Sequence, residues 1–235
     1  MEQLLDQIRT WRRHLHAIPE IGFQEYKTSK YLYEELKKMG YQPLKITETG
    51  IAVYLDFHKE KTLAFRSDID ALEIEEQTGV SFKSTHQGKM HACGHDGHTA
   101  IGLGLAHTLK QFESGLHGVI KLIFQPAEEG TRGARAMVDA GVVDDVDYFT
   151  AVHIGTGVPA GTVVCGSDNF MATTKFDAHF TGTAAHAGAK PEDGHNALLA
   201  AAQATLALHA IAPHSEGASR VNVGVMQAGS GRNVV

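Results

Sequence analysis

The sequence has 235 residues, a net charge of −6 and 20% charged residues. This length allows two modest domains that each bury a core, and the acidic balance without a basic run argues against nucleic acid or an anionic membrane as a partner. A small molecule is the expected partner. The N-terminal segment is charged rather than signal-like, and no run of about 18 apolar residues occurs, so we expect a cytoplasmic protein without a membrane span.

Two helices are predicted first. Apolar residues recur at helical spacing from Leu4 to Leu15, and residues 25–39 form a second helix that Gly40 ends. Two β-rich runs follow at 51–57 and 62–65. The polar turn between them suggests that they are neighbouring strands.

Asp68 and Asp70 come directly after the second of these strands. Carboxylates just beyond the carboxyl end of a strand lie where ligands bind in α/β sheets, so both residues are candidates for a site. Taken alone, either residue is equally well explained as a solvated acid in an Asx turn.

The stretch Met90–Thr99 reads MHACGHDGHT and holds three histidines and a cysteine. In an extended loop Cys93 and His95 point the same way, so a thiolate and an imidazole can face one cation or flank a pair. Both ligands suit zinc, and the imidazole also accepts manganese. The alternative is a loop of solvated histidines with Cys93 as a small buried hydrophobe. A helix follows from Ile101, and its N-terminal dipole favours a thiolate.

Polar residues follow directly after two further predicted strands. The apolar run 119–124 has the pattern of a strand buried on both faces and leads into Gln125–Gly130, which contains Glu128 and Glu129. Gly130 opens another helix that Gly141 ends. The strand 148–152 then terminates in His153.

Glu128 and Glu129 are adjacent, so in an extended segment their side chains point apart and we expect different roles. One can bind a metal while the other acts as general base on a water whose pKa the metal lowers. The alternative is a helix N-terminus that carries acids, which is common.

The strand pattern changes near Met171. Residues 176–180 and 221–225 alternate between apolar and polar, as in strands with one wet face, and an Ala-rich and Leu-rich helix spans 195–211. We therefore predict an α/β domain at 1–170, with a mixed or parallel sheet and helices on both faces. A smaller α+β domain is predicted at 171–235.

At this point the chain resembles the M20 metallopeptidases, within them the amidohydrolase branch that cleaves N-acyl amino acids and related amides. The motifs that carry the resemblance are spread over nearly the whole chain in the family's order: RRHLH with Pro19-Glu20, RSDIDAL from Arg66, MHACGHDGH, QPAEEG, and Thr181-Gly182 through His186-Ala187. MHACGHDGH and QPAEEG together are highly specific.

The resemblance implies a two-domain enzyme with two divalent ions per site, zinc or manganese, with cobalt as a further option. It assigns the following residues: metal ligands Cys93, His95, Glu129 and His153, the base Glu128, lid residue His186 toward the substrate carbonyl, and Asn233 for substrate binding. Asp68 and Asp70 support the site. The smaller domain would be a lid that also mediates a homodimer. Relatives continue past the segment that matches 233–235 and add a further histidine ligand, so the resemblance implies a C-terminally truncated sequence.

Three alternatives to this function stay open. An M20-type dipeptidase or carboxypeptidase would cleave dipeptides rather than N-acyl amino acids. A metal-binding module would bind the ion without turnover. A thiol hydrolase would use Cys93 as its nucleophile and would keep its activity in the presence of a chelator.

Overall fold

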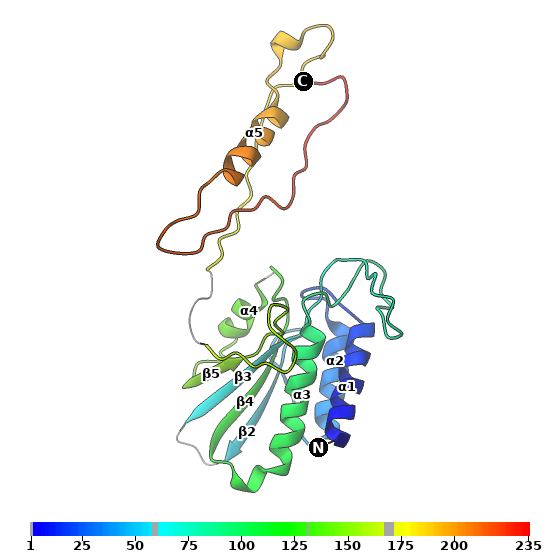
Figure 1. Ribbon diagram of the computed structural model, residues 1–235, viewed down its shortest axis with the longest axis vertical. Coiled ribbons are helices and arrows are strands. Elements are labelled where there is room, and N and C mark those ends of the chain that lie inside the picture. Colours follow the sequence, from blue (N-terminus) through cyan, green and yellow to red (C-terminus); the bar gives the residue numbers. More distant parts are fainter. Residues whose placement is uncertain (1, 58–60, 131, 167–171) are drawn as a thin grey trace. The chain divides into compact units, whose positions relative to one another are not determined.

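The computed structural model describes residues 2–57, 61–130, 132–166 and 172–235 (Figure 1). These residues fall into two compact units, Met1–Gly161 and Thr162–Val235. The domain boundary that we predict at Met171 lies outside the described residues. The division into a catalytic domain and a lid therefore stays a prediction.

The first unit contains one mixed five-stranded sheet with the order β1-β2-β4-β3-β5. Its strands are β1 (Leu44–Lys45), β2 (Ile51–Phe57), β3 (Thr62–Asp68), β4 (Gly118–Gln125) and β5 (Tyr148–Ala151). β4 is antiparallel to β2 and parallel to β3, and β3 is also parallel to β5. The prediction that β2 and β3 are neighbours is wrong, because β4 lies between them and pairs with both. The apolar sequence of β4 suits this central position.

Helices cover both faces of this sheet, as predicted (Figure 1). The helices are α1 (Glu2–Ala17), α2 (Tyr26–Lys38), α3 (His95–Gln111) and α4 (Gly133–Asp139), with a short 3-10 helix η1 at Glu113–Gly115. The larger core joins α1, α2 and α3 to the sheet through residues such as Trp11, Leu36 and Leu103. On the other face, Met137 of α4 packs against Ile123.

The second unit has little regular structure. It contains a 3-10 helix η2 (Pro191–Asp193) and α5 (Ala197–His209), and the described residues of this unit form no strand. The strands predicted at 176–180 and 221–225 are therefore not observed as such, because a strand needs a partner to pair with. None of the described residues of this unit is buried. In the described part of the chain, no helix has both the length and the apolar character that crossing a bilayer requires.

Candidate metal centre

The predicted site residues of the first unit gather at one edge of the sheet. β3, β4 and β5 are parallel, so their carboxyl ends meet at the same edge. Asp68 is the last residue of β3, and His153 follows two residues after β5. α3 begins at His95, and Gly94 before it has φ +90°, which a side chain would strain. The loop therefore turns sharply into α3 between Cys93 and His95.

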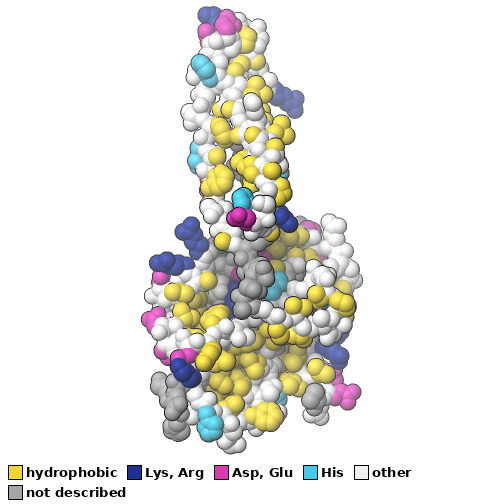
Figure 2. All heavy atoms as spheres, turned by 60° about the vertical axis from the view of Figure 1, so that its left-hand side comes forward, with side chains coloured by type: hydrophobic (Ala, Val, Ile, Leu, Met, Phe, Trp, Pro, Cys, Tyr) yellow, Lys and Arg dark blue, Asp and Glu magenta, His cyan; other side chains and the backbone are white. Residues whose placement is uncertain are grey.

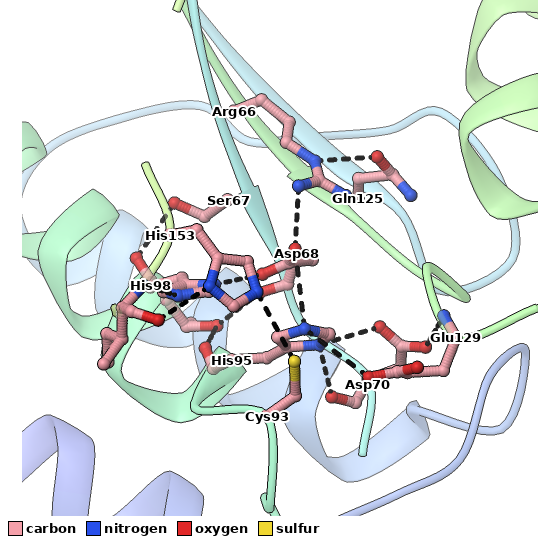
Figure 3. A network of polar contacts seen from close by, with 12 residues as sticks. Arg66, Ser67, Asp68, Asp70, Cys93, His95, His98, Gln125, Glu129 and His153 are labelled. Atoms are coloured by element: carbon pink, nitrogen blue, oxygen red, sulfur yellow. Dashed lines mark hydrogen bonds and ion pairs between the residues drawn. The ribbon is translucent and has the colours of Figure 1, made fainter. Parts of the chain in front are cut away.

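Cys93, His95 and His153 form the centre of the site (Figure 3). One potential ligand atom from each lies within 4.8 Å of the others, and Cys93 Sγ is 3.4 Å from His153 Nε2. His95 is buried, Cys93 is half-buried and His153 is exposed. Residues from two distant parts of the chain thus converge, with the more open side of the centre at His153.

The hydrogen bonds of His95 leave one ring nitrogen ready to accept a metal ion. His95 Nδ1 donates to the backbone carbonyl of Asp70 at 2.9 Å and lies 3.2 Å from the Asp70 carboxylate. Nε2 is buried and has no hydrogen-bond partner. It lies 3.6 Å from Asp68 Oδ2 and 3.9 Å from Glu129 Oε1. In a metal-binding histidine, the ring nitrogen that does not bind the ion usually donates to a carbonyl or a carboxylate, as Nδ1 of His95 does here.

His98 uses both of its ring nitrogens within the protein. Its Nε2 accepts a hydrogen bond from the backbone N–H of Ile154 at 2.8 Å, so Nδ1 carries the proton and donates to Asp68 Oδ1 at 2.6 Å. The His98 ring also lies edge-on to His153, with centroids 4.5 Å apart. His98 thus holds the segment after β5, and with Asp68 and His95 it also forms a fully buried group whose potential ligand atoms lie within 4.8 Å of one another. His153 Nδ1 donates to the carbonyl of Ile154 at 2.9 Å, which leaves its Nε2 facing Cys93.

Asp68 and Asp70 both have protein partners, and their supporting role stays a prediction. Asp68 accepts from His98 and forms an ion pair with Arg66 at 2.7 Å. Burial raises the pKa of Asp68, but the His98 hydrogen bond and the Arg66 charge outweigh it and lower the pKa overall. Asp70 bonds to His95 and also accepts from the backbone N–H of Glu129 at 2.8 Å.

The segment with Glu128 and Glu129 is a turn and not an extended strand end. Ala127 and Gly130 both have positive φ, +53° and +86°. Because of this turn, one carboxylate oxygen from each glutamate lies within 4.8 Å of the other and of a His95 nitrogen. Glu129 is half-buried and Glu128 is exposed. Both adjacent carboxylates therefore reach the same imidazole, which the extended geometry assumed from the sequence does not allow.

The charge around Cys93 favours a cation. Burial raises the pKa of the Cys93 thiol to about 12, and the negative charges of Glu129, Glu128 and Asp68 add to the increase. The expected stabilisation of a thiolate by the N-terminus of α3 is thus outweighed in the protein without a metal ion. A divalent cation would reverse this balance, because it neutralises the carboxylates and binds the thiolate directly.

The donor set fits a divalent metal ion on two counts. His95 Nε2 is a buried nitrogen without a hydrogen-bond partner, and its nearest carboxylate oxygens, from Asp68 and Glu129, lie at 3.6 and 3.9 Å, beyond hydrogen-bond distance. Around it stand a thiol, a second imidazole and two carboxylates, a mixture of soft and hard ligands that suits zinc and also manganese.

Sequence reasoning missed the roles of His98 and Arg66. Both residues lie inside motifs that the sequence singles out, but their partners are Ile154 and Asp68, and a pattern along the chain does not reveal these contacts. Arg66 also donates from Nε to Gln125 at 2.8 Å and so links the ends of β3 and β4. The sequence offers one hint to their roles: Arg66 lies two residues before Asp68, and His98 lies in the same stretch as Cys93 and His95.

His186 and Asn233 lie in the second unit, close to one another. His186 pairs with Val234 in an isolated bridge, and the N–H of Ala187 donates to the carbonyl of Asn233 at 3.0 Å. Both side chains belong to exposed residues. The two predicted lid residues are thus side by side within their own unit, and their roles toward a substrate remain predictions.

Residues 64–228 match the family described as peptidase family M20/M25/M40. The chain is 64% identical to one of the subunits of the p-aminobenzoyl-glutamate hydrolase from Escherichia coli strain K12 and 60% identical to the indole-3-acetyl-aspartic acid hydrolase of Enterobacter agglomerans. Both alignments cover 100% of this chain and 65% of the relative. The chain therefore spans about two thirds of the length of these curated relatives.

A solved structure of a Bacillus subtilis protein shares the fold. That protein is described as a dinuclear metal-binding peptidase from the M20 family, and it matches with a TM-score of 0.66 at 38% identity. The match covers 68% of this chain and 46% of that one. Sequence and structure agree, and the chain belongs to the M20/M25/M40 family of peptidases.

Proposed function

We propose that the protein hydrolyses the amide bond of N-acyl amino acids or related amides with the help of divalent metal ions. One observation carries the proposal: the buried Nε2 of His95 has no hydrogen-bond partner, and His95 lies among a thiol, an imidazole and two carboxylates. The activities for which the two curated relatives are named support the substrate class, because p-aminobenzoyl-glutamate and indole-3-acetyl-aspartate are both amides of an amino acid.

We assign Cys93, His95, Glu129 and His153 as the ligands that would hold the metal. The donor set favours two ions of zinc or manganese, with cobalt as a further option, and the dinuclear description of the Bacillus subtilis protein supports two ions. A thiolate ligand needs a reduced cysteine, and Cys93 is free of a disulfide. This requirement supports a reducing compartment and hence the cytoplasm as the location.

Glu128 is the base in this proposal. Bound metal would lower the pKa of a water molecule toward neutrality and polarise the scissile carbonyl. Glu128 is the more exposed of the two glutamates at the centre, so its carboxylate can take a proton from water at the open side of the site. The same group then donates that proton to the leaving amine nitrogen. Glu129 is half-buried and anchored through its backbone, which suits a ligand.

His186 and Asn233 act from a lid in this proposal. The backbone N–H groups of Gly188 and Ala189 point at His186 Nδ1, at 3.2 and 3.1 Å. In the neutral ring Nε2 therefore carries the proton and can donate to the oxyanion that forms from the substrate carbonyl. Asn233 on the adjacent segment would bind the substrate, and closure would expel water from the centre.

We further propose that residues 171–235 mediate a homodimer. Hydrophobic side chains gather on the surface of the second unit (Figure 2), and the side chains of α5 include Leu206 at 75% exposure and Leu199 at 63%. Apolar area of this kind favours a partner. Light scattering should show a dimer, and replacing Leu206 with Lys should weaken it. A monomer at high protein concentration would contradict this assembly.

A metal and substrate panel tests the proposed function. The protein, loaded with zinc, manganese or cobalt, is assayed with p-aminobenzoyl-glutamate, indole-3-acetyl-aspartate, N-acetyl amino acids and dipeptides. Hydrolysis of the N-acyl compounds that a chelator abolishes and added metal restores would support the proposal. A preference for dipeptides would indicate a peptidase instead. Activity that survives the chelator would indicate a thiol hydrolase, and metal binding without turnover of any compound would indicate a binding module.

A further inference from the structure

Glu25 is a fully buried carboxyl group that the proposed chemistry does not use. Its side chain is 0% exposed, and both carboxylate oxygens accept hydrogen bonds from neutral donors. Oε1 accepts from the backbone N–H of Ala127 at 2.8 Å, and Oε2 accepts from the hydroxyl of Thr49 at 2.8 Å. Burying an acid is costly, so a group that stays buried in this way must be well satisfied by its partners.

The bond to Ala127 crosses from the start of α2 to the turn that carries the two glutamates. Ala127 has φ +53°, a conformation that residues other than glycine rarely adopt. Such a residue persists only when its surroundings hold it. The carbonyl of Ala127 accepts from the N–H of Gly133 at 3.0 Å, so both backbone polar groups of this residue are bound.

Two buried carboxylates hold the backbone on either side of Glu128. Glu25 binds the N–H of Ala127, and Asp70 binds the N–H of Glu129 at 2.8 Å. Glu128 lies between these two fixed amides, and its carboxylate reaches the His95 cluster. A shift of the turn would move Glu128 and Glu129 together.

We propose that Glu25 is a positioning residue that fixes the turn 126–130 and thereby sets where the carboxylates of Glu128 and Glu129 stand at the metal centre. This proposal rests on the proposed function for the role of Glu128 as base. What the turn needs from Glu25 is an acceptor at Oε1. Burial raises the pKa of Glu25, so its surroundings disfavour the charged form and a neutral acceptor of the same shape should serve.

Three variants separate this role from a general structural one. Glu25→Gln keeps an acceptor for the N–H of Ala127, Glu25→Ala removes it, and Thr49→Val removes the hydroxyl on the other oxygen but leaves the bond to Ala127. We expect kcat to fall by about 10- to 100-fold in Glu25→Ala, the range seen when an outer partner of a metal site is lost. Glu25→Gln and Thr49→Val should stay close to the unchanged protein in kcat, and KM should change little in all three.

Amide hydrogen exchange gives a readout that needs neither metal nor turnover. The N–H of Ala127 should exchange at least ten times faster in Glu25→Ala than in Glu25→Gln or Thr49→Val. Combining Glu25→Ala with Glu128→Gln should, at saturating metal, lower kcat little further than Glu128→Gln alone, because the displacement of the base then has no further effect. A merely structural role for Glu25 would give additive losses instead.

The proposal is overturned if the Ala127 amide exchanges at the same rate in Glu25→Ala and Glu25→Gln, or if Glu25→Gln loses as much activity as Glu25→Ala. If Glu25→Ala does not fold, Glu25→Met takes its place in both measurements, because it fills a similar volume but offers no oxygen acceptor to the N–H of Ala127. Failure of the proposed function has a different signature. In that case Glu128→Gln would keep full turnover, or no amide would be cleaved, while the exchange of Ala127 would still depend on Glu25.

Discussion

His95 in the first unit and His186 in the second are held in opposite ways. In Met1–Gly161, His95 is fully buried and each polar contact of its ring is to a named group of the centre. In Thr162–Val235, His186 is exposed, and its Nδ1 is bound by the backbone of its own turn. The first histidine is held by residues distant in sequence, whereas the second is held by its neighbours along the chain.

This difference shows what burial contributes to a functional assignment. A buried nitrogen without a hydrogen-bond partner favours binding of a ligand, because leaving it unsatisfied costs free energy. An exposed imidazole makes no such demand, since water satisfies it. The arrangement around His95 therefore points to a metal on physical grounds, and the role of His186 depends on a substrate that approaches from outside its unit.

The largest effect on metal binding should come from replacing the buried histidine, His95. Replacing His95 with Ala removes the nitrogen that faces Cys93, Glu129 and His153. Metal affinity should fall by more than about 100-fold, beyond the loss of an outer partner, and turnover should vanish with it. Isothermal titration with zinc measures this directly. His186→Ala is the matched control and should bind zinc normally; equal zinc binding by both variants would refute the assigned centre.

Glu128→Gln should produce the next largest effect. The amide keeps the shape of the side chain but cannot accept a proton, so kcat should fall by about 10²- to 10⁴-fold while metal content stays near normal. Metal analysis of the purified variant beside its steady-state kinetics provides the test. Loss of metal in this variant, with metal retained in Glu129→Gln, would indicate that Glu128 is the metal ligand and Glu129 the base.

His186→Ala tests the exposed side of the comparison. If Nε2 of His186 donates to the oxyanion, kcat should fall by about 10²- to 10³-fold, as for other single oxyanion donors, with a smaller change in KM and no change in metal content. His179→Ala is a control in the same unit, also at an exposed residue. Normal turnover in His186→Ala would leave this histidine with a structural role only.

The sequence predicts the structure of the first unit better than that of the second. In the first unit, the apolar run of β4 and the polar residues after each strand predict a mixed sheet with a site at its edge, because local pattern and burial agree there. The order of strands was not predictable, since a short polar turn between β2 and β3 says nothing about a third strand that inserts between them. The alternating segments of the second unit find no pairing partner among the described residues, so their pattern does not become strands.

The sequence also does not reveal hydrogen bonds between residues that are far apart along the chain. Spacing identifies Cys93 and His95 as a pair, but the link from His98 to Ile154 spans 56 residues and the link from Glu25 to Ala127 spans 102. Both links go to backbone N–H groups, which carry no side-chain signature. Motif reasoning therefore finds the residues of the candidate metal centre more readily than those that hold them in place.

The smallest expected effect concerns stability and its dependence on pH. His16 is buried and lies between two carboxylates: its Nδ1 is 2.8 Å from Asp96 Oδ2 and its Nε2 is 3.1 Å from Glu76 Oε1. The hydrogen bond to Asp96 raises the pKa of His16, burial lowers it, and the bond to Glu76 contributes to the net increase. Because the folded-state pKa is raised, His16 stabilises the fold fully below its unfolded pKa of about 6.5, and this contribution is lost as the pH rises through the folded pKa.

Replacing His16 with Gln should therefore destabilise the first unit most at low pH. Hydrogen bonds of a charged donor to buried carboxylates contribute about 1.5 to 3 kcal/mol, so the difference in free energy of unfolding between the unchanged protein and the variant should be of that order near pH 6. It should shrink as the pH rises through the raised folded-state pKa, where His16 loses its proton. Urea unfolding across this pH range measures the difference. A difference for His16→Gln that stays constant with pH would mean that the two carboxylates do not hold a charged imidazole.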